Sequence, residues 1–383
     1  MSERLDVDVA IIGGGTAGCA AAVALRRAGL TVALLEKRLC GAGASGVNFG
    51  GVRQQGRNPA ELPLARRSRE IWDRIDALLE EDTEFEPTGH IKLARSEADM
   101  AELEAYAASA REHGLELTML GANAVRDELP WLGQKVVGAS LSPSDGQANP
   151  RVVGPAFARL ARRLGADVRE HTPVEAGHHT GSGFVVRSGN LEVRSRHLVN
   201  VAGIAADTVA RWFGESPPLE PLRPNMLVTE PLPYFVSRSI GVCGGDVYVR
   251  QVRRGNVIFG GGKGWGDLEL GVARPVTSES LLGMGKTLDL VPGLRHAQVI
   301  RTWAGTDGQT PDRIPVIDHS RTTPGLVHAF GFSGHGFQLG PVVGEIIAEL
   351  VTKGRSISPI EPFAIDRFAP GAATASTGQG ADH

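Results

Sequence analysis

The sequence is poor in cysteine and has no long hydrophobic run. Its three cysteines, Cys19, Cys40 and Cys243, lie far apart and form no CxxC pair. This spacing argues against a disulfide framework and against a zinc site, and it fits a reducing compartment. The apolar run at 9–12 is too short for a signal-peptide core or a membrane span. We therefore expect a cytoplasmic protein without a membrane span.

An excess of charge of either sign is also missing. The chain carries 40 basic and 43 acidic residues, and its formal net charge is −3. This balance gives no reason to expect nucleic acid or an anionic membrane as a partner. Glycine is abundant, at 50 of 383 residues, but it has no fixed period, which excludes collagen-like and solenoid folds. The glycines point instead to tight turns and close backbone approaches.

The first forty residues contain a nucleotide-binding pattern, "DVDVAIIGGGTAGCAAAVALRRAGLTVALLEK". It predicts a buried strand over 7–12, a helix over 16–27 and a second strand over 30–35. Gly13, Gly15 and Gly18 form GxGxxG between the first strand and the helix. In that position they allow a tight turn, the approach of a pyrophosphate to the backbone, and close packing of helix on strand. The helix N-terminus then offers N–H groups to the phosphates.

An acidic residue ends the second strand. Glu36 lies 36 − 18 = 18 residues after Gly18, where a carboxylate can accept both ribose hydroxyls. It would repel the 2′-phosphate of NADP. A tight turn without a ligand would explain GxGxxG alone, but not the strand, helix, second strand and acid together.

Two further glycine-rich segments favour FAD over NAD as the cofactor. "GAGASGVNFGGVRQQGR" (41–57) follows the acid, and "AFGFSGHGFQLGPVVGEII" (329–347) lies near the end of the chain. An NAD domain has no need for either, whereas a longer ligand with a ring system beyond the pyrophosphate does. A strand at 197–201 that ends on Ala202-Gly203 would run under the cofactor at the carboxyl edge of a parallel sheet. The sequence therefore predicts FAD.

The chain resembles the FAD-dependent amine and amino-acid oxidoreductases of the D-amino-acid oxidase superfamily. Within it, the resemblance is to sarcosine oxidase, glycine oxidase and the opine and hydroxyproline dehydrogenase subunits. The similar segments are "IIGGGTAGCAAAVALRRAGLTVALLEK", "GASGVNFGGVRQQGR", "DGQANPRVV", "VNVAG", "TPDRIPVID" and "GFSGHGFQLGPVVGEII". They cover nearly the whole chain.

The resemblance implies an FAD-dependent oxidation of an amino acid or secondary amine. A hydride would pass from the carbon beside nitrogen to flavin N5, the imine would hydrolyse, and O2 would be reduced to H2O2. A dehydrogenase subunit that passes electrons to a partner subunit or quinone is one alternative, and a 2-hydroxy acid oxidoreductase on the same fold is another. A flavin-holding scaffold without turnover is a fourth possibility.

The late loop and a helix starting near Gly340 would cover the pyrimidine end of the flavin, where backbone N–H groups stabilise the reduced anion. His335 is expected to be a cofactor contact and not a general base. The predicted cofactor-binding residues are Gly13, Gly15, Thr16, Ala17, Gly18, Glu36, Lys37, Ala44, Ser45, Asn48, Gly50, Gly51, Val174, Ala202, Gly203, Gly334, His335, Gly336, Phe337 and Gln338.

Each predicted catalytic or substrate-binding residue also has an alternative role that involves neither catalysis nor the substrate. Lys263 either helps oxygen to accept electrons near flavin N5 or is an exposed turn lysine. Arg53, with Arg57 as its substitute, either binds a substrate carboxylate or forms an ion pair. Tyr248 and Arg250 share one face of a strand and face either the substrate or solvent.

Three departures from sarcosine and glycine oxidases affect the expected chemistry. Gly305 stands near the place of a flavin-linked cysteine, so we expect non-covalent FAD. Gln338 replaces a lysine that anchors the substrate carboxylate, which argues against sarcosine itself. The run 306–308 replaces an arginine of glycine oxidases, and Asp307 within it would favour a substrate with a second amine.

The expected fold class is α/β, α+β overall: a Rossmann-like FAD-binding domain with a second, mostly antiparallel-sheet substrate domain. We expect the FAD-binding domain to be discontinuous (1–80, 145–215 and 312–368). The substrate-binding domain would comprise 81–144 and 216–311, with a helix over 96–113. The tail 369–383 is expected to be disordered. The expected partners are a small amino acid or amine, and O2 or a redox partner subunit.

Overall fold

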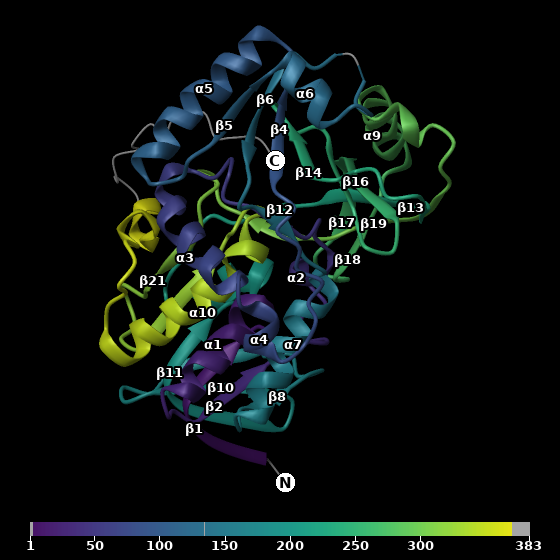
Figure 1. Ribbon diagram of the computed structural model, residues 1–383. Helices are drawn as coiled ribbons and strands as arrows, with labels where there is room; N and C mark the ends of the chain where they lie inside the picture. The colour runs from purple at the N-terminus through teal and green to yellow at the C-terminus, as the bar shows by residue number, and fades with distance from the viewer. Residues whose placement is uncertain (1–2, 134, 370–383) are drawn as a thin grey trace.

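A computed structural model describes residues 3–133 and 135–369, and two eight-stranded sheets dominate it (Figure 1). The predicted tail lies outside the described residues except for Ala369. In the first sheet the strands run in the order β21 (Val316–His319), β22 (Leu326–Phe330), β11 (Leu191–Asn200), β1 (Glu3–Ile12), β2 (Val32–Leu35) and β8 (Asp167–Arg169), with β10 (Phe184–Ser188) and β9 (Ala176–His179) added on β11.

The central strands of this sheet are parallel. β1 pairs in parallel with both β11 and β2, and β11 pairs in parallel with β22. Along β1, Val9 and Ile11 pack into a different hydrophobic cluster from Ala10 and Ile12. Both faces of the strand are therefore buried, which explains its near-continuous apolar sequence.

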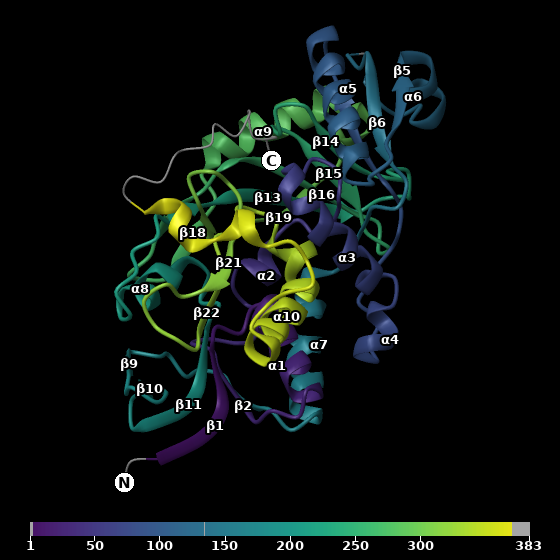
Figure 2. The ribbon, with the colours of Figure 1, turned by 90° about the vertical axis from the view of Figure 1, so that its left-hand side faces the viewer.

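Helices cover one face of the first sheet (Figure 2). They are α1 (Thr16–Arg27), α7 (Pro150–Arg163), α10 (Gly336–Lys353) and α3 (Leu62–Trp72), with the short α4 (Ile75–Leu79) beside α7. The opposite face packs against the β9–β10 hairpin and α8 (Ala206–Arg211).

The expected start of the last helix near Gly340 is wrong by one turn. α10 begins at Gly336, so Phe337 and Leu339 lie on the helix and not in the preceding loop. Both side chains are buried in the same core as α1 and α3. Burial of these two side chains against α1 and α3 favours a helix from Gly336 onward.

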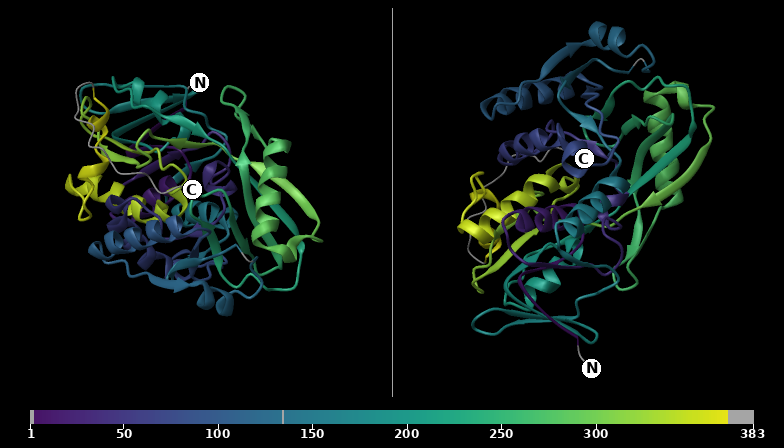
Figure 3. Two further views of the ribbon diagram at one scale, coloured as in Figure 1. Left: turned by 90° about the horizontal axis from the view of Figure 1, so that it is seen from above. Right: turned by 60° about the horizontal axis from the view of Figure 1, so that its bottom comes forward.

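The second sheet is mostly antiparallel, as expected, and only β14 and β4 pair in parallel. Its strands run in the order β19 (Val299–Ala304), β13 (Pro224–Pro231), β16 (Asn256–Lys263), β15 (Tyr248–Gln251), β14 (Ser239–Val242), β4 (His90–Ala94), β6 (Gly138–Ser142) and β5 (Thr118–Gly121). α9 (Thr277–Leu290) and α6 (Ala122–Glu128) pack on one face of it (Figure 3). α5 (Glu97–Glu112) packs beside β4 and β6. The predicted fold class is confirmed.

Several short elements lie outside the two large sheets. They are α2 (Ala44–Val47), β3 (Gly51–Val52), β7 (Gly146–Gln147), β12 (Glu220–Leu222), β20 (Asp307–Gln309), β17 (Trp265–Asp267) and β18 (Val272–Arg274). The first sheet draws strands from 3–35, 167–200 and 316–330, and the second from 90–142 and 224–304. The bounds of the two domains remain a prediction. Within the described residues, none of the helices combines the length and the apolar character that a membrane crossing needs.

The contact between α1 and α10 depends on small residues. A Cβ atom added at Gly344 would lie 2.5 Å from both the carbonyl carbon and the Cβ of Ala20. One turn earlier, a Cβ at Gly340 would lie 2.7 Å from Cγ2 of Thr16. Glycine at these two positions lets α10 approach α1 closely along its N-terminal half.

This contact predicts the effect of one added methyl group. Gly344→Ala should destabilise the protein by about 1–3 kcal/mol, because the new methyl meets backbone that cannot move aside. Gly285→Ala is the matched control, since that helical glycine has open space around it. It should be neutral or stabilise by about 0.5–1 kcal/mol through helix propensity. Urea unfolding of both variants measures the difference, and equal effects would contradict the close packing.

Candidate functional site

The predicted cofactor residues follow different strands of the first sheet but meet at one edge. Gly13 follows β1, Glu36 follows β2, Ala202 follows β11, and Gly334 lies in the loop after β22. Because these four strands are parallel neighbours, their carboxyl ends lie together. That edge is where open α/β sheets bind their ligands.

The turn from β1 into α1 has the geometry that the GxGxxG pattern predicts. Gly13 has φ of +115°, and a Cβ atom there would lie 2.3 Å from the carbonyl oxygen of Val201. A Cβ at Gly18 would lie 2.0 Å from the carbonyl oxygen of Gly13. The N-cap of α1 is Gly15, which has no capping side chain, and the first turn of α1 has no acidic residue. Its N-terminus is thus open to an anion.

The side chain of Glu36 closes this turn. Glu36 accepts hydrogen bonds from the backbone N–H of Gly14 at 2.7 Å and of Arg38 at 2.9 Å, one at each carboxylate oxygen. Each oxygen keeps a lone pair for a ribose hydroxyl. The hydroxyl of Thr16 is buried and has no partner among the described residues. Lys37 follows Glu36, and Val174 packs at the margin of the cluster behind β1.

The second glycine-rich segment folds against the first. Ser45 in α2 accepts a hydrogen bond from the backbone N–H of Thr16 at 2.9 Å. The Asn48 amide donates to the carbonyls of Ala44 and Ser45 and accepts from the N–H of Gly50 at 2.7 Å. Asn48 therefore holds the segment that leads through Gly50 and Gly51 into β3.

The late loop ends at the N-terminus of α10. Ser333 has φ of +52°, a strained conformation for a residue with a side chain, and such strain is common at functional sites. The Gly334 N–H donates to the Asp307 carboxylate at 2.8 Å, and burial raises the pKa of this carboxyl. His335 is the N-cap of α10, which carries no acidic residue in its first turn.

Gln338 lies inside α10 and not in the loop. Its side-chain Nε2 donates to the carbonyl of Ala65 in α3 at 2.8 Å, while its Oε1 is buried without a partner among the described residues. Its backbone carbonyl accepts from Ser68 and Trp72. Gln338 thus joins α10 to α3, and Oε1 remains available to a ligand.

Tyr248 and Arg250 both contact Phe49, which lies in the second glycine-rich segment. The rings of Phe49 and Tyr248 meet edge to face at 4.9 Å, and the Arg250 guanidinium lies 5.4 Å from the Phe49 ring centre. Burial raises the pKa of Tyr248, whose residue is half-buried. A Cβ at Gly260 would overlap the Tyr248 ring, which explains a glycine there.

Arg250 is a buried cation with few partners. Its Nη1 donates to the carbonyl of Ala148 at 3.2 Å, and its Nε is buried without a partner in the described part of the chain. No carboxylate of the described residues pairs with it, and burial lowers its pKa to about 10. A guanidinium held in this way is suited to an anionic ligand group.

Arg53 and Arg57 lie close together between β3 and α3. Arg57 donates from Nε to the Arg53 carbonyl at 3.1 Å, and its Nη1 is buried without a partner. Burial lowers the pKa of Arg57 to about 10, and Arg53 adds to the effect. Neither arginine has the ion pair that one alternative predicted for it, as far as the described residues show.

Lys263 is exposed at the end of β16, apart from the buried arginines. It borders a cavity of about 250 Å³ together with Arg223 and Gln309. Gln309 bridges to Phe332 at the start of the late loop. Lys263 therefore stands beside the elements that carry the late loop.

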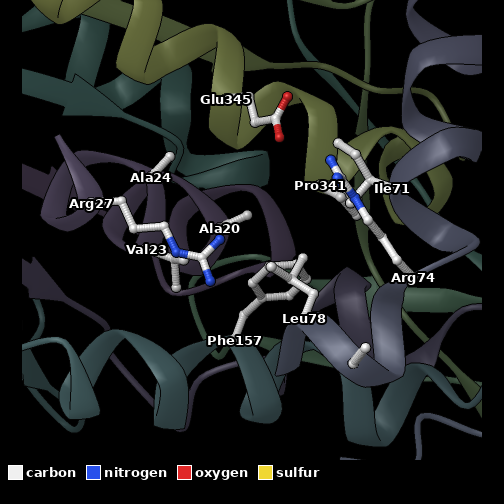
Figure 4. A pocket seen from close by; sticks show the side chains of 11 residues that line it. Ala20, Val23, Ala24, Arg27, Ile71, Arg74, Leu78, Phe157, Pro341 and Glu345 are labelled. Carbon is white, nitrogen blue, oxygen red and sulfur yellow. The ribbon is translucent and has the colours of Figure 1, made fainter. Parts of the chain in front are cut away.

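A larger groove, of about 470 Å³, lies elsewhere (Figure 4). Ala20, Val23 and Arg27 of α1 line it, with Phe157 and Glu345 from α7 and α10. Its position along the C-terminal half of α1 is away from the GxGxxG turn. None of the predicted site residues borders it, so it is not the candidate site.

The residues at the carboxyl edge fit FAD. The open start of α1 fits the pyrophosphate, Glu36 fits the ribose, and the buried Thr16 hydroxyl lacks a partner that a ligand would supply. Sequence reasoning missed Phe49 and Glu61. The run from Asn58 to Glu61 does match a capping-box pattern, which predicts a helix start but not a contact with His335.

Comparison with known proteins agrees with the geometry. Residues 8–350 match the family model DAO, described as FAD dependent oxidoreductase. The chain is 27% identical to one of the subunits of opine oxidase from Rhizobium meliloti, over 95% of this chain and 98% of that protein. It is 26% identical to glycine oxidase of Geobacillus kaustophilus, over 94% and 97% of the two chains.

Solved structures share the fold. L-proline dehydrogenase from P. horikoshii superposes with a TM-score of 0.87 at 26% identity, covering 96% of this chain and 98% of that one. The structure of the Geobacillus kaustophilus glycine oxidase also gives 0.87, covering 96% and 100%. The matched range spans both sheets and every segment of the candidate site. The chain therefore belongs to the DAO family of FAD-dependent oxidoreductases.

Proposed function

We propose that this protein is an FAD-dependent oxidase of an amino acid or secondary amine, with non-covalently held FAD and with O2 as electron acceptor. The observation that carries the proposal is the buried guanidinium of Arg250, which pairs with no carboxylate of the described residues and lies against the cofactor segment through Phe49. Bound FAD would accept a hydride from the carbon beside the substrate nitrogen. The imine product then hydrolyses in water.

The chain's own residues would bind and orient the substrate. Arg250 pairs with the carboxylate, and Tyr248 on the same strand face limits how the rest of the molecule lies. Gln338 offers Oε1 as an acceptor, and Arg53 and Arg57 offer N–H groups on the α3 side of the site. The reaction then depends on the orientation of the substrate and on the charges near the cofactor more than on a dedicated acid–base pair.

We propose that FAD is held non-covalently because no cysteine stands at the expected place of a covalent link to the flavin. The described cysteines Cys19, Cys40 and Cys243 are all buried. Cys243 follows β14, and Gly305 occupies the expected place of a flavin link next to Val47. Denaturation should therefore release free FAD into the supernatant.

A dehydrogenase subunit is the second candidate. Similar proteins are named as subunits of an opine oxidase and of a sarcosine oxidase, so they work as parts of larger assemblies. One similar structure is named a dehydrogenase. Lys263 borders a cavity together with Gln309, which bridges to the late loop, and this position favours the oxidase, because a cation near the reduced cofactor stabilises negative charge that develops on oxygen.

Anaerobic reduction of the flavin tests the proposed function. The holoprotein should lose its visible flavin absorbance when mixed with one member of a panel of D- and L-amino acids, N-methyl amino acids and opines. Readmitted air should restore the band quickly and yield peroxide. Slow recovery in air would favour the dehydrogenase, reduction by 2-hydroxy acids alone would favour the hydroxy-acid alternative, and a chain that binds no FAD would refute the proposal.

Arg250→Met tests the carboxylate anchor. The variant should bind the carboxylate-bearing substrate about 10–100-fold more weakly, because a charge-assisted hydrogen bond in a buried site is lost. Arg254→Met is the control, since Arg254 is exposed on the following turn. Stopped-flow flavin reduction at varied substrate concentration gives the dissociation constant. If both variants bind like the parent chain, Arg250 is not the anchor.

Lys263→Met separates the oxidative from the reductive half-reaction. Flavin reduction by substrate under nitrogen should keep its rate, whereas reoxidation by O2 should slow at least about tenfold, because the nearby positive charge is removed. Stopped-flow mixing of the reduced protein with oxygenated buffer measures this rate. Unchanged reoxidation would identify Lys263 as an ordinary exposed lysine.

A further inference from the structure

A buried His–Glu pair lies at the N-terminus of α10. The Nδ1 atom of His335 lies 2.9 and 3.0 Å from the two carboxylate oxygens of Glu61. The Glu61 side chain is fully buried, and that of His335 is 10% exposed. The two residues are 274 positions apart, so the contact joins the start of α3 to the loop before α10.

The charges around the pair decide which group holds the proton. Burial lowers the pKa of His335 to about 4, and the positive charge of Arg57 adds to this effect. Burial opposes ionisation of Glu61 as well, but the attraction to His335, the hydrogen bond with it and the charge of Arg57 hold its pKa below the ordinary value. At neutral pH the carboxylate is therefore ionised and the imidazole is neutral.

A neutral imidazole beside an ionised carboxylate has one defined tautomer. An ionised carboxylate only accepts hydrogen bonds, so Nδ1 must carry the proton and donate it. Nε2 then holds a lone pair. No hydrogen bond to Nε2 is formed within the described part of the chain, and Arg57 Nη1 in the same cluster is also unpartnered there. Both atoms are available to a ligand.

Other charged groups at the start of α10 are few among the described residues. Arg53 and Arg57 approach from the segment before α3, and Asp307 approaches from β20 through the N–H of Gly334. Of the two carboxylates, Glu61 contacts the His335 side chain directly, whereas Asp307 accepts a hydrogen bond from the backbone N–H of the preceding residue, Gly334.

We propose that Glu61 is a positioning residue for the flavin, which holds His335 with its proton on Nδ1 and its acceptor Nε2 toward the pyrimidine edge of the ring. This proposal rests on the proposed function, because it takes α10 as the helix that faces that edge. Glu61 also places one negative charge near the ring, which disfavours the anionic reduced form. The pair therefore keeps the reduction potential of the bound cofactor low.

The wild-type protein tests the tautomer directly. In ¹⁵N-labelled holoprotein, the His335 ring should show a protonated Nδ1 and an unprotonated Nε2 at pH 7, with the signal assigned by its absence in His335→Asn. A protonated Nε2 would overturn the proposal. This measurement needs no Glu61 variant, so it decides the matter even if such a variant does not fold.

Substitution of the carboxylate tests the effect on the flavin. Glu61→Gln should raise the midpoint potential and tighten sulfite binding to the oxidised flavin at least about tenfold, because a nearby negative charge is removed. Glu349→Gln is the matched control, since Glu349 is a buried carboxylate near the other end of α10 that pairs with Arg67. It should change neither quantity.

A double substitution shows whether Glu61 acts through His335. In the His335→Asn background, Glu61→Gln should lose a large part of its effect on sulfite binding. An equal effect in both backgrounds would show that Glu61 acts by its charge alone and not through His335, and an equal effect of Glu349→Gln would show that the effect is not specific to Glu61; either result would overturn the proposal. A chain that takes up no FAD is a different result, since it refutes the proposed function itself.

Discussion

The close approach of α1 to the strand before it and to α10 is the constraint on which the rest of the structure depends. A side chain at Gly13, Gly18 or Gly344 would collide with backbone atoms of Val201, Gly13 and Ala20, respectively. This packing places the open N-terminus of α1 at the carboxyl edge of the sheet, and it brings the start of α10 to the same edge. Two helix N-termini there offer N–H groups to the two anionic parts of FAD, the pyrophosphate and the reduced ring.

The second sheet closes the site from the opposite side. Its strand β15 presents Tyr248 and Arg250, and both touch Phe49 from the cofactor segment. Charge is distributed unevenly across this space: Arg250 has no ion-pair partner among the described residues, whereas Arg57 lies near Glu61 and His335. This difference is the reason for proposing Arg250 as the main anchor of a substrate carboxylate, with Arg53 and Arg57 in a secondary role.

The first strand–helix–strand unit was predictable from the sequence, and the contacts across the chain were not. α1 spans the expected residues 16–27, because alanine-rich composition and flanking glycines define a helix locally. The start of α10 was missed by one turn, since burial of Phe337 against distant residues decides it. The partner of His335 could not be foreseen, because Glu61 lies 274 residues away and a single sequence carries no sign of that pairing. The side-chain bond of Gln338 to Ala65 was missed for the same reason.

A crystal structure of the chain grown with FAD tests the central claim most directly. The account predicts density for the pyrophosphate at Gly13–Thr16, for the adenosine ribose at Glu36, and for the pyrimidine edge beside residues 334–337, with Arg250 facing the ring from β15. A cofactor whose ring lies away from the start of α10, or whose phosphates avoid the N-terminus of α1, would contradict it.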